Sequence, residues 1–467
     1  MSKSKDARIC ELEAEVAQLK QLLTQALKRI AQLEKNSRTS SKPPSSEIVK
    51  PPALGNGGSG SGGGSGGGSG GRKKKRSIGG QKGHPGNQRK AFAQDEIDQA
   101  FEYDFAHDDQ PGDDWELLDS FYIHQQVELR DDPLIVSEHR FAQYRHRKTG
   151  RTINAPVPES LQKQGLFGPR LRALTATLKG DLHASYRGIK RLYEDALGLG
   201  VSTGYLAKVI GQASDALASS YDELLAALPD EPVLNMDETS HRDCGDRPWL
   251  WAAVAKRLTV FKIAARRNAK VIESLLGLAY EGIIGCDFHS AYRKFFRLSG
   301  GCSGAFCWAH LIRDVRYLTT LTDKSTVNWA NKLLDEIRRL FRAYHTQGER
   351  AQQNAKSLIL KRVRHPPKRG EAQTLGKRLR EQKTGYFLFL EHHAVDPTNN
   401  VAERALRHGV IQRKMTLGTR GNTGQRWVER MLSVRATCQQ QGRSFYTYLV
   451  DAITAYTHGR ESPALLT

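Results

Sequence analysis

Apolar residues over the first 35 positions of the 467-residue chain recur in alternating steps of three and four. The repeating positions are Ile9, Leu12, Val16, Leu19, Leu23, Ala26, Ile30 and Leu33. Such heptad spacing is typical of a coiled coil, whose apolar seam faces a partner helix. The charged pairs flanking a parallel seam are attractive, as in Arg8 with Glu13 and Glu15 with Lys20. We therefore expect residues 1–35 to form a dimerising coiled coil; the alternative is an amphipathic helix packed on its own domain.

Residues 36–90 carry no such pattern and are rich in Ser, Pro and Gly. A stretch built almost wholly from Gly and Ser, 55–71, buries too little apolar surface to fold. The segment that follows, 72–90, is basic and has no acidic residue. It suits a flexible arm on DNA phosphates or in a minor groove, with a solvated charge run as the alternative. The candidate DNA-binding residues of this arm are Arg72, Lys73, Lys74, Lys75, Arg76, Lys82 and His84.

Residues 91–160 begin acidic and end in short alternating segments. Positions 95–119 hold eleven acidic residues and no Lys or Arg, which indicates a solvated face or, alternatively, a shield over a basic surface. Short strands are predicted at 121–127, 134–136 and 139–144. We therefore expect a small β-rich module in this part of the chain.

The spacing becomes helical over residues 161–229. Two apolar-periodic segments flank the turn 198–200, and Ser202 is a suitable N-cap for the second. These are the proportions of a helix-turn-helix unit, although a plain helical bundle gives the same pattern. The residues expected to contact DNA in the first case are Arg187, Lys190 and Lys208.

Two short apolar runs each lead into an acid: 233–236 into Asp237, and 282–286 into Asp287. A third acid, Glu403, opens a helical pattern after the breaker 397–400. A carboxylate at the rim of a sheet core is costly unless a partner such as a divalent cation offsets its charge. If folding brings the three together, they can hold two Mg²⁺ ions for phosphoryl transfer. The alternative is that they are surface acids or helix caps.

The elements around these acids predict a ribonuclease-H-like domain. The expected order is a strand from Val233, a hairpin, a helix, a fourth strand bearing Asp287 and a late helix bearing Glu403. An amphipathic helix over 328–344 falls between the second and third acids, so a helical insertion interrupts the domain. The predicted fold is thus multidomain α/β. The first part of the catalytic core is expected at 230–300 and the insertion at 301–395. The second part of the core, with the C-terminal helices, is expected at 396–467.

The formal net charge of +21 favours an anionic partner, and basic residues gather near the C-terminal acid as well. The segment 361–383 has nine Lys or Arg against two acids, and a glycine-rich turn spans 418–424. Both are candidates for phosphate contact, with a solvated helical face as the alternative for the first. The residues expected to meet double-stranded DNA here are Arg404, Arg407, Arg413, Lys414 and Arg420.

Six sparse cysteines show no disulfide framework, which favours a reducing compartment. The longest apolar runs are far too short for a bilayer, and the first 30 residues lack the apolar region of a signal peptide. We expect a cytoplasmic, nucleoid-associated protein of a prokaryote with no membrane partner.

Four short motifs, in their order along the chain, resemble those of the IS66 family of bacterial insertion-sequence transposases. They are Met236-Asp237-Glu238-Thr239, Asp287-Phe288-His289-Ser290-Ala291-Tyr292, Cys307-Trp308-Ala309-His310 and Asn399-Asn400-Val401-Ala402-Glu403-Arg404-Ala405-Leu406-Arg407. The heptads, the run 40–46 and the run 79–86 fit the same order, so the resemblance covers most of the chain. Carried over by position, Asp237, Asp287 and Glu403 become the acidic triad.

The resemblance implies a DDE transposase that binds the terminal inverted repeats of an insertion sequence, cleaves its ends and joins the 3′-hydroxyls to target DNA. Two Mg²⁺ ions per active site, with Mn²⁺ as a substitute, are its implied cofactors. A homodimer or higher oligomer and small accessory proteins are its implied partners besides DNA. The competing functions are a ribonuclease-H-like nuclease without strand transfer and a transposase-derived DNA-binding protein.

One departure from the family concerns cysteine. Family members commonly place paired cysteines in a zinc-finger-like module after the zipper, whereas no cysteine lies between Cys10 and Cys244 here. That module cannot bind zinc through thiolates. Cys307 and His310 match a Cys-x-x-His pair of the family, but with Cys302 they supply only three metal ligands. A packing or DNA-contacting role is the expectation for Cys307, Trp308 and His310.

Overall fold

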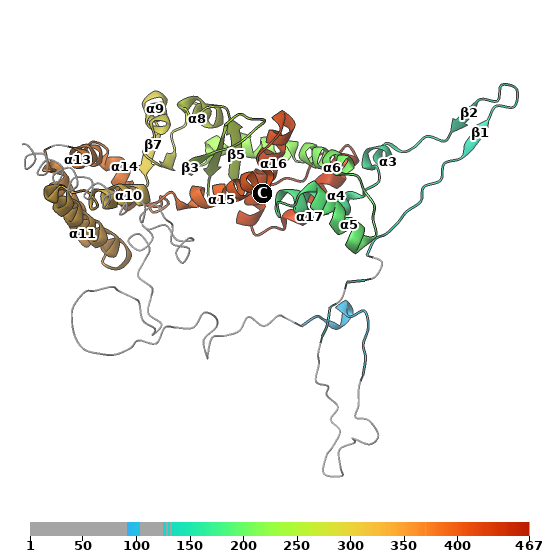
Figure 1. Ribbon diagram of the computed structural model, residues 1–467, viewed down its shortest axis with the longest axis horizontal. Coiled ribbons are helices and arrows are strands. Elements are labelled where there is room, and N and C mark those ends of the chain that lie inside the picture. The colour runs from blue at the N-terminus through green and yellow to red at the C-terminus, as the bar shows by residue number, and fades with distance from the viewer. Residues whose placement is uncertain (1–90, 103–124, 128, 131–132, 369, 467) are drawn as a thin grey trace, which may run out of the picture. The chain divides into compact units, whose positions relative to one another are not determined.

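The computed structural model describes residues 91–102, 125–127, 129–130, 133–368 and 370–466 (Figure 1). The predicted coiled coil, the linker and the basic arm from Arg72 to His84 lie outside the described residues. The chain divides into two compact units, residues 57–139 and the remainder. Each is described by itself.

Little regular structure is present in the described part of the first unit. A single 3-10 turn, η1 (Gln94–Glu96), lies near its start. The strand predicted at 134–136 is wrong: this segment has no ladder partner, and Ile135 and Val136 are 96% and 91% exposed. The module is therefore less β-rich in its described residues than its alternating pattern indicates. The reason is that alternation forms a strand only where a neighbouring strand supplies hydrogen bonds and a buried face.

The second unit opens with a two-stranded antiparallel hairpin of β1 (Gln143–Arg145) and β2 (Thr152–Asn154). Tyr144 pairs with Ile153 across it, and every side chain of both strands is exposed. The strand predicted at 139–144 is thus present only at its end. After the short helix α3 (Glu159–Gln164), the chain enters its helical and sheet domains.

A five-stranded mixed sheet forms the centre of this unit, in the order β5-β4-β3-β6-β7. Its strands are β3 (Val233–Ser240), β4 (Trp249–Val254), β5 (Thr259–Ala264), β6 (Ile283–Cys286) and β7 (Ser303–Phe306). The first three are antiparallel, whereas β6 and β7 run parallel to β3. The predicted first strand, hairpin and fourth strand are all present. Strand β7 was not predicted, and it carries the sheet past the boundary expected at residue 300.

Helices cover both faces of the sheet. Neighbouring residues of a strand point to opposite faces, so one strand can identify both layers. Glu238 of β3 reaches Tyr292 in α9 (Ser290–Ser299), which follows α8 (Ala269–Leu276). On the other face α15 (Asn400–Thr416) packs on β3 and β4, and α16 (Gly421–Gln440) packs on β5. Asp237 therefore faces the α15 side.

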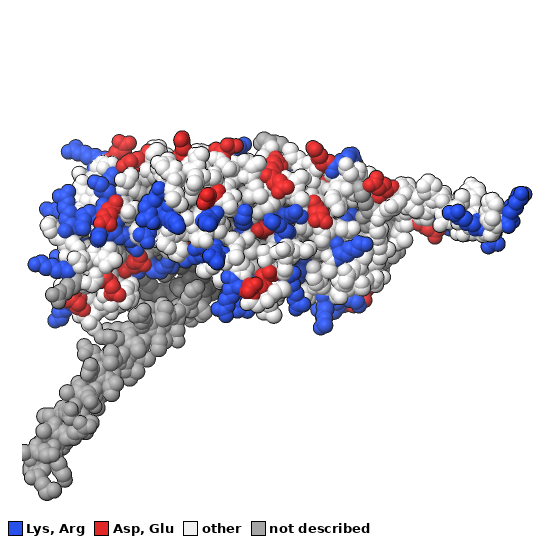
Figure 2. Space-filling model, turned by 90° about the horizontal axis from the view of Figure 1, so that it is seen from above, with Lys and Arg blue, Asp and Glu red and all other residues white. Residues whose placement is uncertain are grey.

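A helical subdomain is inserted between β7 and α15, as the sequence predicts. It contains α10 (Trp308–Leu318), α11 (Lys324–Thr346), α12 (Glu349–Arg364), α13 (Glu371–Glu381), α14 (Lys383–Phe387) and η4 (Leu388–Leu390). Several basic residues of the segment 361–383 serve internal contacts: Arg362 pairs with Glu336, and Arg378 with Asp314. Figure 2 shows Lys and Arg spread over the face drawn, with Asp and Glu scattered among them. No single basic stripe is visible on that face.

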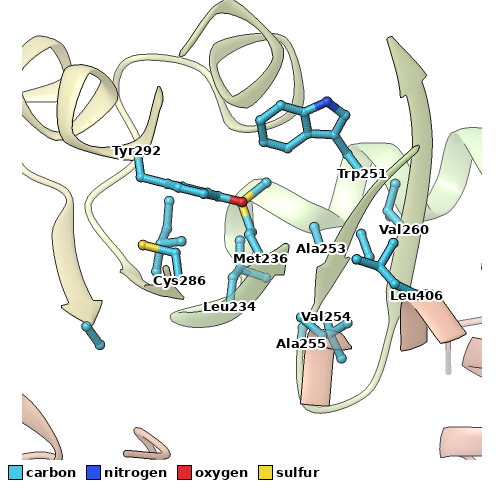
Figure 3. Close-up of a cluster of buried hydrophobic side chains, with 14 of the residues drawn as sticks. Leu234, Met236, Trp251, Ala253, Val254, Ala255, Val260, Cys286, Tyr292 and Leu406 are labelled. Carbon is cyan, nitrogen blue, oxygen red and sulfur yellow. The ribbon is translucent and has the colours of Figure 1, made fainter. Parts of the chain in front are cut away.

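The largest hydrophobic core extends from the sheet into the insertion and the C-terminal helices. Figure 3 shows its part over β3 and β4, where Tyr292 extends toward Met236 and Trp251. The rings of Trp251 and Tyr292 are 6.0 Å apart and lie edge to face. Because this packing fixes α9 on β3, it also fixes the polar groups that border the core.

The predicted helix-turn-helix pair is present as two helices, α5 (Tyr186–Leu197) and α6 (Thr203–Ala216). Ser202 caps α6 as expected, accepting the backbone N–H of Tyr205. The two helices share a small core of their own, centred on Tyr193 and Leu206. Helix α4 (Pro169–Gly180) and α6 also pack on α17 (Phe445–Thr457). The connection to the sheet is made by α7 (Ala218–Ala227) and η3 (Leu228–Asp230).

The five described cysteines are all free, and four of them are buried. Among the described helices, none has the length and apolar character needed to cross a membrane.

Candidate active site

Asp237 lies in the middle of β3 and not at its end, because the β3–β4 ladder continues to Ser240. Burial, together with the nearby charges of Glu238, Asp287 and Glu403, raises the pKa of Asp237 to about 7. A carboxyl group surrounded by other carboxyls and removed from water resists ionisation. The three acids from β3, the end of β6 and α15 therefore lie within electrostatic reach of one another.

Asp287 follows β6 and is held by two contacts. Its Oδ1 accepts the backbone N–H of His289 at 2.9 Å, at the start of α9. Its Oδ2 lies 3.3 Å from the Nη2 of Arg267. One cation of the chain thus already compensates part of the negative charge at this position.

Glu403 occupies the first turn of α15, where the helix dipole favours an acid. The buried residue Asn399 fixes the start of this helix. Its side-chain amide donates to the carbonyl of Met236 at 2.7 Å, and its backbone N–H donates to the Sγ of Cys307 at 3.2 Å. These contacts place the first turn of α15 beside Asp237.

Glu238 projects to the opposite face from Asp237, as strand alternation predicts. Its side chain is fully buried, and it accepts hydrogen bonds from Tyr292 and from Arg267. Burial raises the pKa of Glu238, while the hydrogen bond from Tyr292 and the charge of Arg267 oppose that rise. Arg267 contacts both Glu238 and Asp287, so it connects the buried acid to the candidate site.

His310 and Trp308, expected to pack or to contact DNA, lie in different surroundings. The Nδ1 of His310 lies 3.8 Å from the Oε1 of Glu403 and has no hydrogen-bond partner in the described part of the chain. Burial lowers the pKa of His310, and Arg313 lowers it further. Trp308 is completely buried, and its indole N–H donates to the carbonyl of Tyr386. It packs in the core of the insertion, so the expectation that it contacts DNA is wrong.

The donor chemistry of Asp237, Asp287 and Glu403 fits a hard divalent cation, since all are carboxylates. The raised pKa of Asp237 also favours a cation site, because a bound cation would offset the burial and the crowded negative charge that raise this pKa. Within the described residues, however, no three acid, histidine or cysteine side chains are close enough together to hold a metal ion. The carboxylates are neighbours without forming a complete coordination shell.

The model of the family described as "Transposase IS66 family" matches residues 164–426, more than half of the chain. The chain belongs to the IS66 transposase family. The matched region of this IS66 chain includes the whole five-stranded sheet, the insertion and all three acids.

Two similar proteins come from Sinorhizobium fredii (strain NBRC 101917 / NGR234). "Uncharacterized protein y4jD" is 22% identical over 341 residues, which is 66% of this chain and 66% of that protein. "Uncharacterized protein y4qI" is 24% identical over 361 residues, which is 68% of this chain and 65% of that protein. Each match thus spans slightly less than two thirds of the relative's own length.

The predicted DNA-contacting residues of the IS66 chain lie in two places. Arg404, Arg407 and Lys414 are exposed on α15, and Arg420 is exposed just before α16. Arg413 is half-buried and donates to Ser240 at the end of β3. In the helix pair, Arg187 and Lys208 are exposed, whereas Lys190 pairs with Glu194 at 2.5 Å.

Three further residues at the site escaped prediction. Arg267 follows β5, Tyr292 lies on α9, and Asn399 precedes α15. Tyr292 and Asn399 belong to the quoted family motifs, which was their available signal, but their contacts could not be assigned from the sequence. Arg267 gives no signal beyond its charge, because only the sheet brings it to Glu238.

Proposed function

We propose that this chain is a DDE transposase, in which Asp237, Asp287 and Glu403 form the catalytic triad. The observation that supports the proposal most strongly is the raised pKa of Asp237, to which burial and the other two acids contribute. Perturbed acids that converge from distant segments are typical of catalytic sites. Family membership supplies the reaction class: cleavage at the element ends and joining of the 3′-hydroxyls to target DNA.

The sheet supports a ribonuclease-H-like core. Three antiparallel strands, a parallel fourth strand beside the first, and a late helix carrying an acid are what the sequence predicts, and the structure adds a fifth strand, β7, parallel to the fourth. The first acid is on the central strand and the second follows the adjacent parallel strand. The third, Glu403, comes from α15 after an insertion of helices. We infer from this order of elements that the three acids act as one site.

Two Mg²⁺ ions, replaceable by Mn²⁺, would bind Asp237, Asp287 and Glu403 and would supply activation of the attacking oxygen and stabilisation of the leaving oxygen. The residues of the chain prepare this site. Asn399 and Met236 set the position of Glu403, and the turn after β6 sets that of Asp287. Arg267 orients Asp287 and neutralises the buried Glu238. His310, whose Nδ1 lies 3.8 Å from Glu403, can hold or release a proton beside that acid.

Double-stranded DNA is the proposed partner, contacted first through its phosphates. The exposed basic residues of α15, α5 and α6 supply charge for that contact. The predicted N-terminal coiled coil would pair two chains, as bringing two element ends together requires. Accessory proteins remain part of the proposal through the family resemblance.

The test uses the genomic DNA that flanks this coding sequence, cloned around a marker. Asp287→Ala should abolish cleavage and joining in Mg²⁺ and leave DNA binding within about threefold of the wild type. Asp222→Ala is the matched control, because Asp222 is an exposed acid on α7. Residual Mg²⁺-dependent joining by Asp287→Ala would refute the triad.

The same experiment separates the two competing functions. A nuclease without strand transfer would cut the flanking DNA but would not join pre-cleaved 3′ ends to a target plasmid. A DNA-binding protein without activity would show neither reaction, and Asp287→Ala would then change nothing measurable. Joining of pre-cleaved ends by the wild type therefore decides in favour of the transposase.

A further inference from the structure

A cavity of about 460 Å³ lies where the loop between β3 and β4 meets the turn between α15 and α16. Four of its lining residues are basic, and none is acidic. Arg242 and Arg247 come from the β3–β4 loop, and Arg413 and Lys414 come from the end of α15. The two loop arginines were not among the residues predicted to meet DNA. The cavity also has an apolar wall at Leu417, which is 74% exposed.

The positive charge in this cavity is largely uncompensated. Arg242, Arg247 and Lys414 form no ion pair with any acid in the described part of the chain, and all three are exposed. Arg413 donates to the carbonyl and hydroxyl of Ser240, which are neutral. Like charges held close together repel one another, and an anion between them removes that repulsion. The lining therefore suits an anionic ligand.

A buried acid, Asp243, fastens the two walls of the cavity together without facing into it. Its Oδ1 accepts the hydroxyl of Thr419 and the backbone N–H of Gly421, each at 2.8 Å. Its Oδ2 accepts the side-chain amide of Gln425 at 2.7 Å. Burial alone would raise the pKa of Asp243, but these hydrogen bonds outweigh it and hold the pKa below its usual value. The β3–β4 loop is thus tied to the first turn of α16.

Both loops contain residues with positive φ angles, a backbone conformation that residues other than glycine rarely adopt. Leu417 and Cys244 have positive φ angles of 61° and 48°. Gly418 has a φ of 103°, and a Cβ there would lie 2.2 Å from the carbonyl of Arg242. That carbonyl accepts the backbone N–H of Thr419 at 2.8 Å. Strained backbone of this kind persists where surrounding contacts impose it, and it clusters at binding and catalytic sites.

We propose that this cavity binds one nucleotide of the DNA strand that runs from the candidate active site, with its phosphate on Arg242, Arg247 and Lys414. The volume lies in the range of small-ligand pockets and exceeds what one phosphate fills, and Leu417 offers the base or sugar an apolar surface. Ser240 lies three positions after Asp237 on β3, a distance of about 10 Å along a strand. About three stacked nucleotides span that distance. The inference rests on the proposed function and specifies how the site would hold its substrate.

The first test measures binding of a fluorescein-labelled single strand of twelve thymidylates to the full-length chain by fluorescence anisotropy. The double variant Arg242→Ala/Arg247→Ala should raise the Kd at least tenfold at low salt. Each phosphate neutralised on a single strand contributes about 0.7 to the slope of log Kd against log salt, so losing the one phosphate in the cavity should lower the slope by about 0.7. The matched control is Lys256→Ala/Arg257→Ala, on the β4–β5 turn at the other end of β4. This control removes the same charge. Its Kd should stay within about twofold of the wild-type value, and its salt slope within about 0.3.

The second test measures the Kd of Asp243→Ala, which general charge attraction and our inference predict to change in opposite directions. Asp243→Ala raises the net charge of the chain by one, so general attraction to DNA would tighten binding. Because it also releases the two walls of the cavity, our inference requires a several-fold increase in Kd. A far-UV circular dichroism spectrum like that of the wild type shows that the variant is folded; if it is not folded, the arginine pair decides alone.

The outcomes separate this inference from the proposed function. If Arg242→Ala/Arg247→Ala behaves like Lys256→Ala/Arg257→Ala, or if folded Asp243→Ala binds more tightly, the cavity is not a nucleotide site, while the transposase proposal stands. If the wild type binds no DNA at all, both fail. A loss confined to the cavity variants supports the inference.

Discussion

The side-chain amide of Asn399 donates a 2.7 Å hydrogen bond to the carbonyl of Met236, joining residues 163 positions apart in the chain. Met236 immediately precedes Asp237 on β3, and Asn399 is the N-cap of the helix that carries Glu403. This buried amide therefore joins the central strand to the start of the late helix, while Arg413 joins the end of β3 to the last turn of that helix. The Oδ1 of Asn399 has no partner among the described residues, which leaves an acceptor free beside the acids.

Replacing Asn399 should impair the chemistry more than the binding of DNA. Asn399→Ala leaves the Met236 carbonyl without its donor and lets the first turn of α15 shift, so cleavage should fall at least tenfold. The Kd for DNA should change by less than threefold, because Asn399 is only 1% exposed. The unfolding free energy should fall by about 1–3 kcal/mol for the unsatisfied buried carbonyl. Asn422→Ala, an exposed position in α16, is the control; cleavage at the wild-type rate in Asn399→Ala would contradict this account.

Asp237 should make the metal-free protein less stable as the pH rises. Its pKa is about 7 in the folded state against 3.8 in the unfolded chain, so the group stabilises the fold below about pH 4 and that contribution is lost by pH 7. Each unit of pKa difference corresponds to about 1.4 kcal/mol, which gives up to about 4 kcal/mol. In urea unfolding with EDTA, the midpoint of the wild type should fall relative to that of Asp237→Asn as the pH rises from 4 to 8.

Divalent cations should reverse that decline. Adding Mg²⁺ at pH 8 should raise the unfolding midpoint of the wild type and leave that of Asp237→Asn unchanged, since ions that bind only the folded state stabilise it. Equal responses of the two proteins would argue against a cation at this carboxylate.

The sequence predicts local elements well where one segment decides them. Ser202 as an N-cap, α11 as an amphipathic helix and Glu403 in a first helical turn needed no information from distant residues. Strand β7 did need information from distant residues. Its four residues include a glycine and give a weak pattern, so that pairing with β6 decides their structure.

The candidate site was predicted only in part, for the same reason. The three acids could be named from their settings and their family motifs, but not the strand position of Asp237, which depends on pairing with β4. Trp308 lies in a family motif with His310 and was expected to contact DNA, yet Phe341, Tyr386 and Phe387 enclose it from later parts of the chain. Burial by distant segments cannot be read from one stretch of sequence.

Arg267 should be required for both stability and orientation of the site. Arg267→Ala leaves Glu238, whose side chain is fully buried, without its cation. It also removes the ion pair that holds Asp287. Removing one partner of a buried pair costs about 3–5 kcal/mol, and the partial exposure of Arg267 places the expected loss near the lower end. Thermal unfolding measures it. Arg267→Ala/Glu238→Gln should recover part of the stability, whereas a double variant as unstable as the sum of the single changes would show that the pair is not coupled.

His408 should make the protein sensitive to acid. It lies on α15 against the end of α4, with its ring centroid 4.3 Å from that of His183 and its Nε2 3.3 Å from the carbonyl of Gly180. Burial, together with the charge of Arg435, lowers the pKa of His408 to about 4.

The unfolded chain therefore binds a proton at His408 between about pH 6.5 and 4 that the folded protein does not. The stabilisation is present above pH 6.5 and is lost as the pH falls toward 4. The loss amounts to at most about 3 kcal/mol, at about 1.4 kcal/mol for each unit of pKa difference. As the pH falls from 7 to 4.5, the urea midpoint of His408→Gln should rise relative to that of the wild type, whereas His458→Gln, at an exposed position, should follow the wild type. If His408→Gln also follows the wild type, another group governs the acid sensitivity of the contact between α15 and α4.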